Sequence, residues 1–104
     1  MGRAASPFSA SFVDGVAVFV GEMEIGTRDR MDGVFADLRA AAASGDVVID
    51  VAGVTFCDSS GLNQIARLYR ALGPGCVLTI RNPDSHLRRT LDITGVSQVV
   101  KVEP

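Results

Sequence analysis

Four small or acidic residues, Asp58-Ser59-Ser60-Gly61, stand between two apolar segments of different periodicity. The run 47–56 before them is largely apolar and rich in valine, which is typical of a buried strand. In 62–72 after them, apolar residues recur at helical spacing. The four residues therefore form a corner where a strand ends and a helix begins, and they bring one acid and two hydroxyl groups to that corner.

A helix start of this kind suits a phosphate. The first turn of a helix has unpaired backbone N–H groups and the positive end of the helix dipole, and both stabilise a bound or covalent phosphoryl group. We expect Ser60 in that first turn with its hydroxyl near the surface, and Asp58 or Ser59 as the cap. Gly61 leaves no side chain beside Ser60, so a modifying enzyme could approach closely. The simpler interpretation is that Asp58, Ser59 and Ser60 only cap the helix.

Phosphorylation of Ser60 would change how this corner meets a partner. A phosphoserine carries about −1.5 to −2 charges at neutral pH, here beside Asp58 and beside apolar surface from Val54, Phe56 and Leu62. A partner docked there would have to desolvate the phosphate or leave it unpaired, and a buried unpaired charge costs roughly 3–5 kcal/mol. Since about 1.4 kcal/mol is a tenfold change in affinity, one phosphate is enough to separate a tight complex.

Other kinds of site find little support in the residue pattern. The single histidine, His86, falls on the expected solvent side of a helix, and the Gly-x-Ser-x-Gly motif is absent, so Ser60 lacks a general base. Cys57, Cys76 and His86 do not have the spacing of metal ligands, and the two cysteines are expected to be reduced and buried. We expect no catalytic residues, no metal and no cofactor.

Length and charge bound the remaining possibilities. A chain of 104 residues forms one domain with a single modest core. A net charge of −2 gives no basic footprint for direct contact with nucleic acid. No apolar run approaches the roughly 18 residues of a membrane span, and the first ten residues lack the apolar segment of a secretory signal. We expect a cytoplasmic protein that does not bind membranes.

The elements around the corner follow from periodicity and turn residues. Asp14-Gly15 favours a tight hairpin turn, and Thr27 and Asn82 are candidate helix caps. The segment 21–26, with two glycines, is expected to be a connection, and 47–51 a central strand covered on both faces. Gln64 is assigned to a solvent-facing side together with Asn63, Arg67 and Arg70. The predicted strands cover 8–13, 16–20 (fully buried), 47–51, 76–80 and 99–102, and the predicted helices cover 28–43, 62–72 and 83–94.

The predicted order is β-β-α-β-α-β-α-β. Strand–helix alternation after the hairpin favours parallel strands joined by right-handed crossovers. The fold class is therefore α/β, with a mixed sheet and helices packed against it. Residues 1–7 are expected to be a flexible N-terminus, and 8–104 a single domain.

From Phe8 to Val102 the chain resembles the STAS domain, in particular the single-domain bacterial anti-sigma factor antagonists. The resemblance is carried by three segments: Gly21-Glu22-Met23-Glu24-Ile25; Val48-Ile49-Asp50-Val51 with Phe56-Cys57-Asp58-Ser59-Ser60-Gly61-Leu62; and Leu87-Arg88-Arg89-Thr90-Leu91-Asp92-Ile93-Thr94-Gly95.

The resemblance implies a transcription regulator of the stress response that is switched by phosphorylation. In the family, the second hydroxyl residue of the corner is phosphorylated by a cognate anti-sigma factor, which is an ATP-dependent serine kinase. Carried over, that residue is Ser60. The unphosphorylated form would bind the anti-sigma factor and free the sigma factor, and a phosphatase would reset the phosphorylated form. The implied partner-binding residues are Glu24, Asp58, Ser59, Gly61, Leu62 and Asn63.

Two departures leave the partner open. Glu24 stands where the family usually has aspartate, and Asn63 and Gln64 stand where small or apolar residues are common. The alternative function is a STAS docking subunit of a stress-sensing or lipid-transport complex without a phospho-switch. The sequence does not name the sigma factor, kinase or phosphatase, and it leaves open modification of Ser59 and the oligomeric state.

Overall fold

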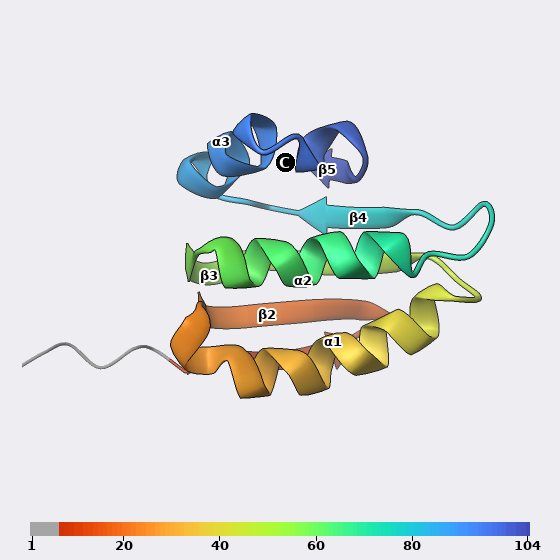
Figure 1. Ribbon diagram of the computed structural model, residues 1–104, viewed down its shortest axis with the longest axis horizontal. Helices are drawn as coiled ribbons and strands as arrows, with labels where there is room; N and C mark the ends of the chain where they lie inside the picture. Colours follow the sequence, from red (N-terminus) through yellow and green to blue (C-terminus); the bar gives the residue numbers. More distant parts are fainter. Residues whose placement is uncertain (1–6) are drawn as a thin grey trace, which may run out of the picture.

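A computed structural model describes residues 7–104, which form one five-stranded sheet with helices against it (Figure 1). The strands β1 (Ser9–Val13), β2 (Val16–Met23), β3 (Val47–Cys57), β4 (Leu78–Arg81) and β5 (Lys101–Glu103) lie side by side in that order. β1 is antiparallel to β2, and the other neighbours are parallel. The predicted α/β class and element order are confirmed. Apart from Pro7, the expected flexible N-terminus lies outside the described residues.

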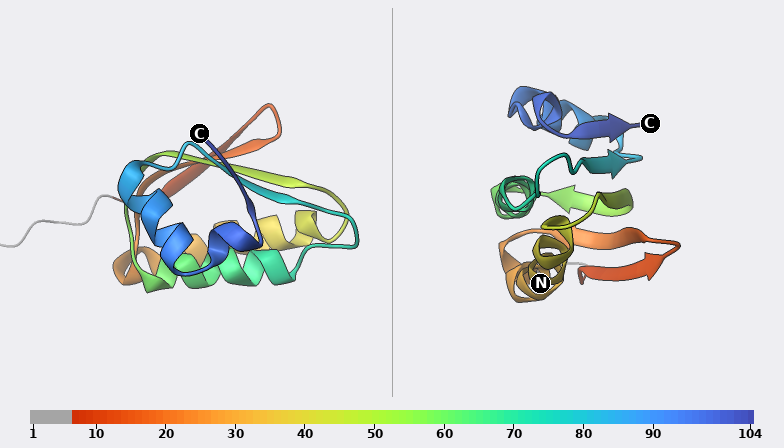
Figure 2. Two further views of the ribbon diagram at one scale, coloured as in Figure 1. Left: turned by 90° about the horizontal axis from the view of Figure 1, so that it is seen from above. Right: turned by 90° about the vertical axis from the view of Figure 1, so that its right-hand side faces the viewer.

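The helices α1 (Arg28–Ala42), α2 (Ser59–Arg70) and α3 (Ser85–Ile93) all lie on the same face of the sheet (Figure 2). Two short 3-10 turns, η1 (Ile25–Thr27) and η2 (Val96–Gln98), precede α1 and follow α3. Each parallel strand adds next to the preceding one in the same direction. Right-handed crossovers therefore carry every helix to one side. The prediction that 47–51 is covered on both faces is wrong: Val47, Ile49 and Val51 are buried, but Val48 and Asp50 are only half-buried.

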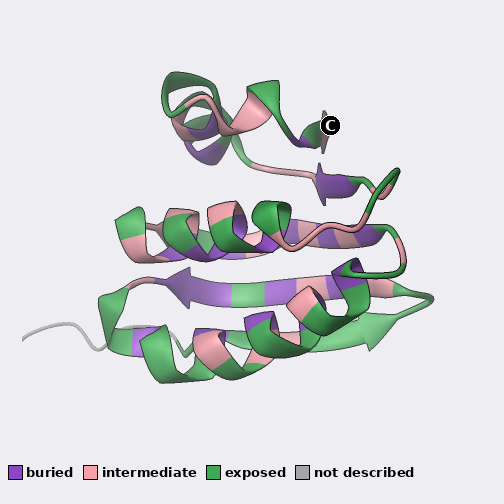
Figure 3. Cartoon of the chain, turned by 45° about the vertical axis from the view of Figure 1, so that its right-hand side comes forward, coloured by how far each residue is buried: buried purple, intermediate pink, exposed green. Residues whose placement is uncertain are grey.

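The core fills the space between this sheet face and the helices (Figure 3). At one end, three phenylalanines pack edge to face. The ring centroids of Phe8 and Phe19 are 5.0 Å apart, and those of Phe19 and Phe35 are 5.5 Å apart. All three side chains are fully buried. They join β2 to α1 and to the residue before β1, so the hairpin and the first helix share one core. No helix within residues 7–104 is long and apolar enough to cross a membrane.

The hairpin turn at Asp14-Gly15 is confirmed. Both residues have positive φ, 52° and 79°, as the two-residue turns that match strand twist require. The prediction that 16–20 is fully buried is wrong, because the side chains of β2 alternate between the two faces of the sheet. Phe19 faces the helices, whereas Val20 on the open face is 48% exposed.

β2 also continues further than predicted. Glu22 and Met23 pair with Phe56 and Cys57 of β3, so 21–23 is strand rather than connection. Gly21 marks a close approach instead of a loop: its φ is +99°, and a Cβ there would lie 2.1 Å from the carbonyl oxygen of Pro7.

Several predicted ends shift by a few residues. α3 is capped by Asp84, whose Oδ1 accepts from the Leu87 N–H at 2.7 Å, and not by Asn82. Asn82 instead has a φ of 62° and donates its side-chain N–H to Asp50 at 3.1 Å. β4 begins at Leu78 and β5 at Lys101, each two residues later than predicted.

The two faces of the hairpin predict different costs for the same substitution. Phe19→Ala removes a fully buried ring and should lower the free energy of unfolding by about 3–5 kcal/mol. Phe12→Ala is the control, because Phe12 is 60% exposed, and it should cost less than about 1 kcal/mol. Urea unfolding followed by circular dichroism measures both. Equal losses would contradict the placement of the core.

Candidate functional site

The site lies where β2 and β3 end at the same edge of the sheet. Met23 and Cys57 are the last paired residues of the two strands, and the Asp58 N–H still donates to the Met23 carbonyl at 3.0 Å. Beyond this point one chain segment enters η1 and α1, and the other enters α2. The starts of two crossovers therefore lie side by side, although they are more than 30 residues apart in sequence.

Asp58 links these two starts. Its Oδ1 accepts from the Ser60 N–H at 2.8 Å, which caps α2. Its Oδ2 accepts from the Ile25 N–H at 3.3 Å, at the beginning of η1. The half-buried carboxylate is thus both a helix cap and a cross-link. Of the two predicted caps, Asp58 rather than Ser59 is the one that forms.

Ser60 is the second residue of α2 and is half-buried, whereas Ser59 before it is exposed. This agrees with the predicted place of Ser60 in a first helical turn near the surface. Ser60 lines an open groove of about 340 Å³ that runs along α2 and reaches the first residue of α1. Its role as phosphate acceptor remains a prediction.

Glu24 is held against its own turn. Its N–H donates to the Thr27 Oγ1 at 3.1 Å, and a Cβ placed on Gly26 would lie 2.5 Å from the Glu24 carboxylate. Thr27 is buried, and its hydroxyl donates to the Glu22 carbonyl at 2.7 Å. Thr27 is the N-cap residue of α1, as predicted, but its hydroxyl closes the η1 turn and makes no cap hydrogen bond to α1.

Gly61 is buried, and its lack of a side chain serves packing. A Cβ at this position would lie 2.7 Å from the Cys57 Sγ and 2.9 Å from the Met23 Cβ. Gly61 therefore lets α2 approach the ends of β2 and β3. The expected reason for this glycine, room for an enzyme beside Ser60, is wrong. Contact between Gly61 and a partner remains a prediction.

Cys57 does not supply a nucleophile to the corner. Burial, and secondarily the charge of Asp58, raise the pKa of its thiol to about 12, so the thiol is protonated at neutral pH. Within residues 7–104, no group of three acidic, histidine or cysteine side chains is placed to hold a metal ion.

The apolar surface at the corner differs from the predicted one. Phe56 is 47% exposed as expected, and Ile25, which the sequence analysis did not include, is 61% exposed. Val54 is buried, because a register shift after Asp50 keeps it on the helix side of the sheet. Leu62 is half-buried and packs against the core, while Asn63 is exposed.

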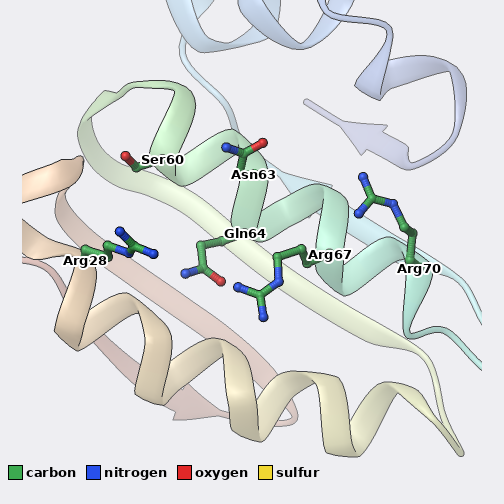
Figure 4. Close-up of a pocket in the computed structure, with 6 residues that line it drawn as sticks. All are labelled: Arg28, Ser60, Asn63, Gln64, Arg67 and Arg70. Atoms are coloured by element: carbon green, nitrogen blue, oxygen red, sulfur yellow. The ribbon is translucent and has the colours of Figure 1, made fainter.

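Figure 4 shows the groove beside Ser60, and it includes residues that sequence reasoning assigned only to solvent. Gln64 is buried: its amide donates to Asp32 of α1, and its carbonyl accepts from Arg39 at 3.5 Å. The periodicity of α2 alone could not show that α1 lies beside this face. The available signal was spacing, since positions 60, 64 and 67 share one side of a helix. The groove is lined by Arg28, Ser60, Asn63, Gln64, Arg67 and Arg70.

A family model described as Mlab, STAS domain matches residues 24–102, well over half of the chain. The chain belongs to the STAS domain family. The match includes the η1 turn, the Asp58 corner and α2 with its groove. No curated protein is significantly similar to the chain in sequence.

Solved structures share the fold of this STAS domain. An anti-sigma factor antagonist from Mycobacterium paratuberculosis is 28% identical, with 93% of this chain and 84% of that chain covered and a TM-score of 0.71. An anti-sigma-factor antagonist (STAS) domain protein from Planctomyces limnophilus is 16% identical, with 95% and 90% covered and a TM-score of 0.69.

The anti-sigma factor antagonist SpoIIAA is similar in two states. Its unphosphorylated form is 18% identical, with 93% of this chain and 86% of that chain covered and a TM-score of 0.62. The phosphorylated form, from Bacillus, is 18% identical, with 91% and 89% covered and a TM-score of 0.63. These likenesses confirm the predicted STAS fold.

The double role of Asp58 predicts a measurable loss of stability. Asp58→Ala removes the cap of α2 and the link to Ile25, and should cost about 2 kcal/mol of unfolding free energy. Asp58→Asn is the matched control: it retains a side-chain oxygen for the cap and should lose clearly less. Guanidinium unfolding measures both. An Asp58→Ala protein as stable as the parent would contradict the cross-link.

Two helical glycines predict opposite effects of alanine. Gly61→Ala should destabilise the domain by about 1–3 kcal/mol, because the new methyl group overlaps Cys57 and Met23. Gly33→Ala in α1 meets no atom within 4 Å and should stabilise it by up to about 1 kcal/mol through helix propensity. Thermal unfolding compares the pair. A neutral Gly61→Ala would mean that α2 does not need this close approach.

Proposed function

We propose that this STAS domain is an anti-sigma factor antagonist that is switched off by phosphorylation of Ser60. In its unphosphorylated form it binds an anti-sigma factor with ATP-dependent serine kinase activity and thereby releases the sigma factor. The observation that carries this proposal is the half-buried Ser60 in the first turn of α2, directly after the Asp58 cap.

The surface around Ser60 supports docking of a protein. Phe56 and Ile25 expose apolar side chains at the same edge of the sheet. Exposed Ser59 and Asn63 and half-buried Glu24 and Leu62 add polar and apolar contacts there. A partner that covers these residues also covers the Ser60 hydroxyl, so the docked kinase would hold its substrate serine in reach.

Asp58 makes the switch strong. Both of its carboxylate oxygens are held by backbone N–H groups, so the side chain cannot turn away from a new negative charge. A phosphoserine with about −1.5 to −2 charges would therefore face a fixed carboxylate on one side and a desolvating partner on the other. Repulsion from Asp58 and the cost of desolvating the phosphate then both act against the complex.

The named relatives support this function. The Mycobacterium paratuberculosis protein, 28% identical over most of both chains, is an anti-sigma factor antagonist. SpoIIAA has the same fold in unphosphorylated and phosphorylated forms. We place the protein in the cytoplasm, where sigma factors and ATP are found, with a phosphatase that removes the phosphate from Ser60.

Phosphorylation is tested directly by intact mass. The purified domain is mixed with ATP and, one at a time, the anti-sigma factors of the serine kinase type encoded by the same genome. We expect one of them to add a single phosphoryl group that maps to Ser60. Ser60→Ala should abolish the gain, while Ser59→Ala, altered at the adjacent exposed hydroxyl, should retain it.

Binding measurements test whether negative charge at position 60 weakens the complex. Ser60→Asp should weaken the complex with the phosphorylating partner at least about tenfold, which is about 1.4 kcal/mol. Ser44→Asp is the matched control, because Ser44 is an exposed serine just beyond the last residue of α1, at the opposite end of that helix from the corner. Isothermal titration measures both affinities. Tight binding of Ser60→Asp would rule out electrostatic switching.

The alternative is a docking subunit without a phospho-switch, in a stress-sensing or lipid-transport complex. It is kept because the matching family description, Mlab, STAS domain, does not name an anti-sigma factor. A stable partner complex that buries the corner, combined with no phosphorylation by any kinase of the class above, would favour this function.

A further inference from the structure

The groove that Ser60 lines is positively charged, although the whole chain has a net charge of −2. Arg28, Arg67 and Arg70 line it, and no carboxylate does. Within residues 7–104, the side chains of these arginines have no ion pair or hydrogen bond. Two ion pairs among residues 7–104 lie on β4 and β5 instead, where Glu103 contacts Arg81 and Lys101.

Two of the arginines face the serine end and the middle of the groove. Arg28, the first residue of α1, extends across the groove toward the start of α2, where Ser60 lies (Figure 4). Arg67 extends into the groove from α2, whereas Arg70 turns away from both. Gln64 lies between them and is tied to Asp32, so α1 and α2 are held at a constant spacing.

The charges around Ser60 favour a phosphoryl group that turns into the groove, toward Arg28. The Ser60 N–H is already bonded to Asp58, so this donor of the helix start is occupied, and the Asp58 charge repels a phosphate. The Glu24 carboxylate is folded over Gly26, and Asp32 accepts from Gln64. Arg28, at the serine end of the groove, and Arg67, further along it, carry positive charges that no carboxylate of the described residues pairs with.

We propose that Arg28, with Arg67, binds the phosphoryl group of phosphorylated Ser60 and so joins the start of α2 to α1. The inference rests on Ser60 being the acceptor of the proposed function. A guanidinium group suits this ligand, because its forked N–H groups can bond two phosphate oxygens at once. The bound phosphate would neutralise the groove and would be held on the domain itself, away from Asp58.

The test places phosphoserine at position 60 during translation, so that neither kinase nor partner is needed. Phosphorus NMR then follows the second pKa of the phosphate, which is about 6 in an exposed phosphoserine. In the parent this pKa should be lower than in Arg28→Gln/Arg67→Gln by roughly half a unit or more, because a nearby positive charge favours the dianion. The difference should shrink in about 1 M salt.

Three further variants make the result specific. Arg28→Lys keeps the charge without the fork and should give an intermediate pKa. Arg89→Gln removes an exposed arginine of α3 that does not line the groove, and should leave the pKa unchanged. Ser59→Ala removes the neighbouring hydroxyl and should also leave it unchanged. Unaltered circular dichroism would show that each variant is folded.

Two results would overturn the inference: the same phosphate pKa in the parent and the double variant, or an equally large shift of that pKa in Arg89→Gln. A third arm adds inorganic phosphate to the unphosphorylated domain. If this free anion binds at the groove arginines while the phosphoserine pKa ignores them, the groove serves a separate anion and the proposal fails. Failure of every kinase to modify Ser60 is a different result, and it would count against the proposed function alone.

Discussion

The Asp58 carboxylate is the interaction on which the corner depends. β2 and β3 run parallel and end together, and each is followed by a turn whose first N–H groups have no partner in the sheet. Asp58 accepts one such N–H from each turn, that of Ile25 and that of Ser60. The bridge therefore stabilises two helix entries at once, through the exposed Ile25 N–H and the part-buried Ser60 N–H. It also holds a negative charge beside the serine.

Two contacts on α2 then determine where Ser60 lies. Gly61 lets the helix approach Met23 and Cys57 closely, and Gln64 is tied to Asp32 of α1. Ser60 therefore lies between the buried contact of Gly61 with the strand ends and the groove that contains Gln64. In the proposed switch, phosphorylation changes charge at a fixed position, and the partner responds to that charge.

Prediction from the sequence succeeded for features that depend on a few neighbouring residues. The Asp14-Gly15 turn, the Asp58 cap and the helical place of Ser60 belong to this group. It failed where a distant element decides the environment. Gln64 looked solvent-facing because the periodicity of α2 does not show α1 beside it. Val54 was expected at the surface, but a register shift between β2 and β3 reverses the alternation of β3 and buries it.

The sequence by itself determined that residues 58–61 start a helix with a hydroxyl in its first turn, because capping bonds and helical periodicity act within about four residues. Only the tertiary structure decided that Asp58 also holds Ile25, that Gln64 is buried, and that Arg28 faces the groove beside Ser60. Those contacts join residues about 30 positions apart. They form because right-handed crossovers carry α1 and α2 to the same face of the sheet, side by side.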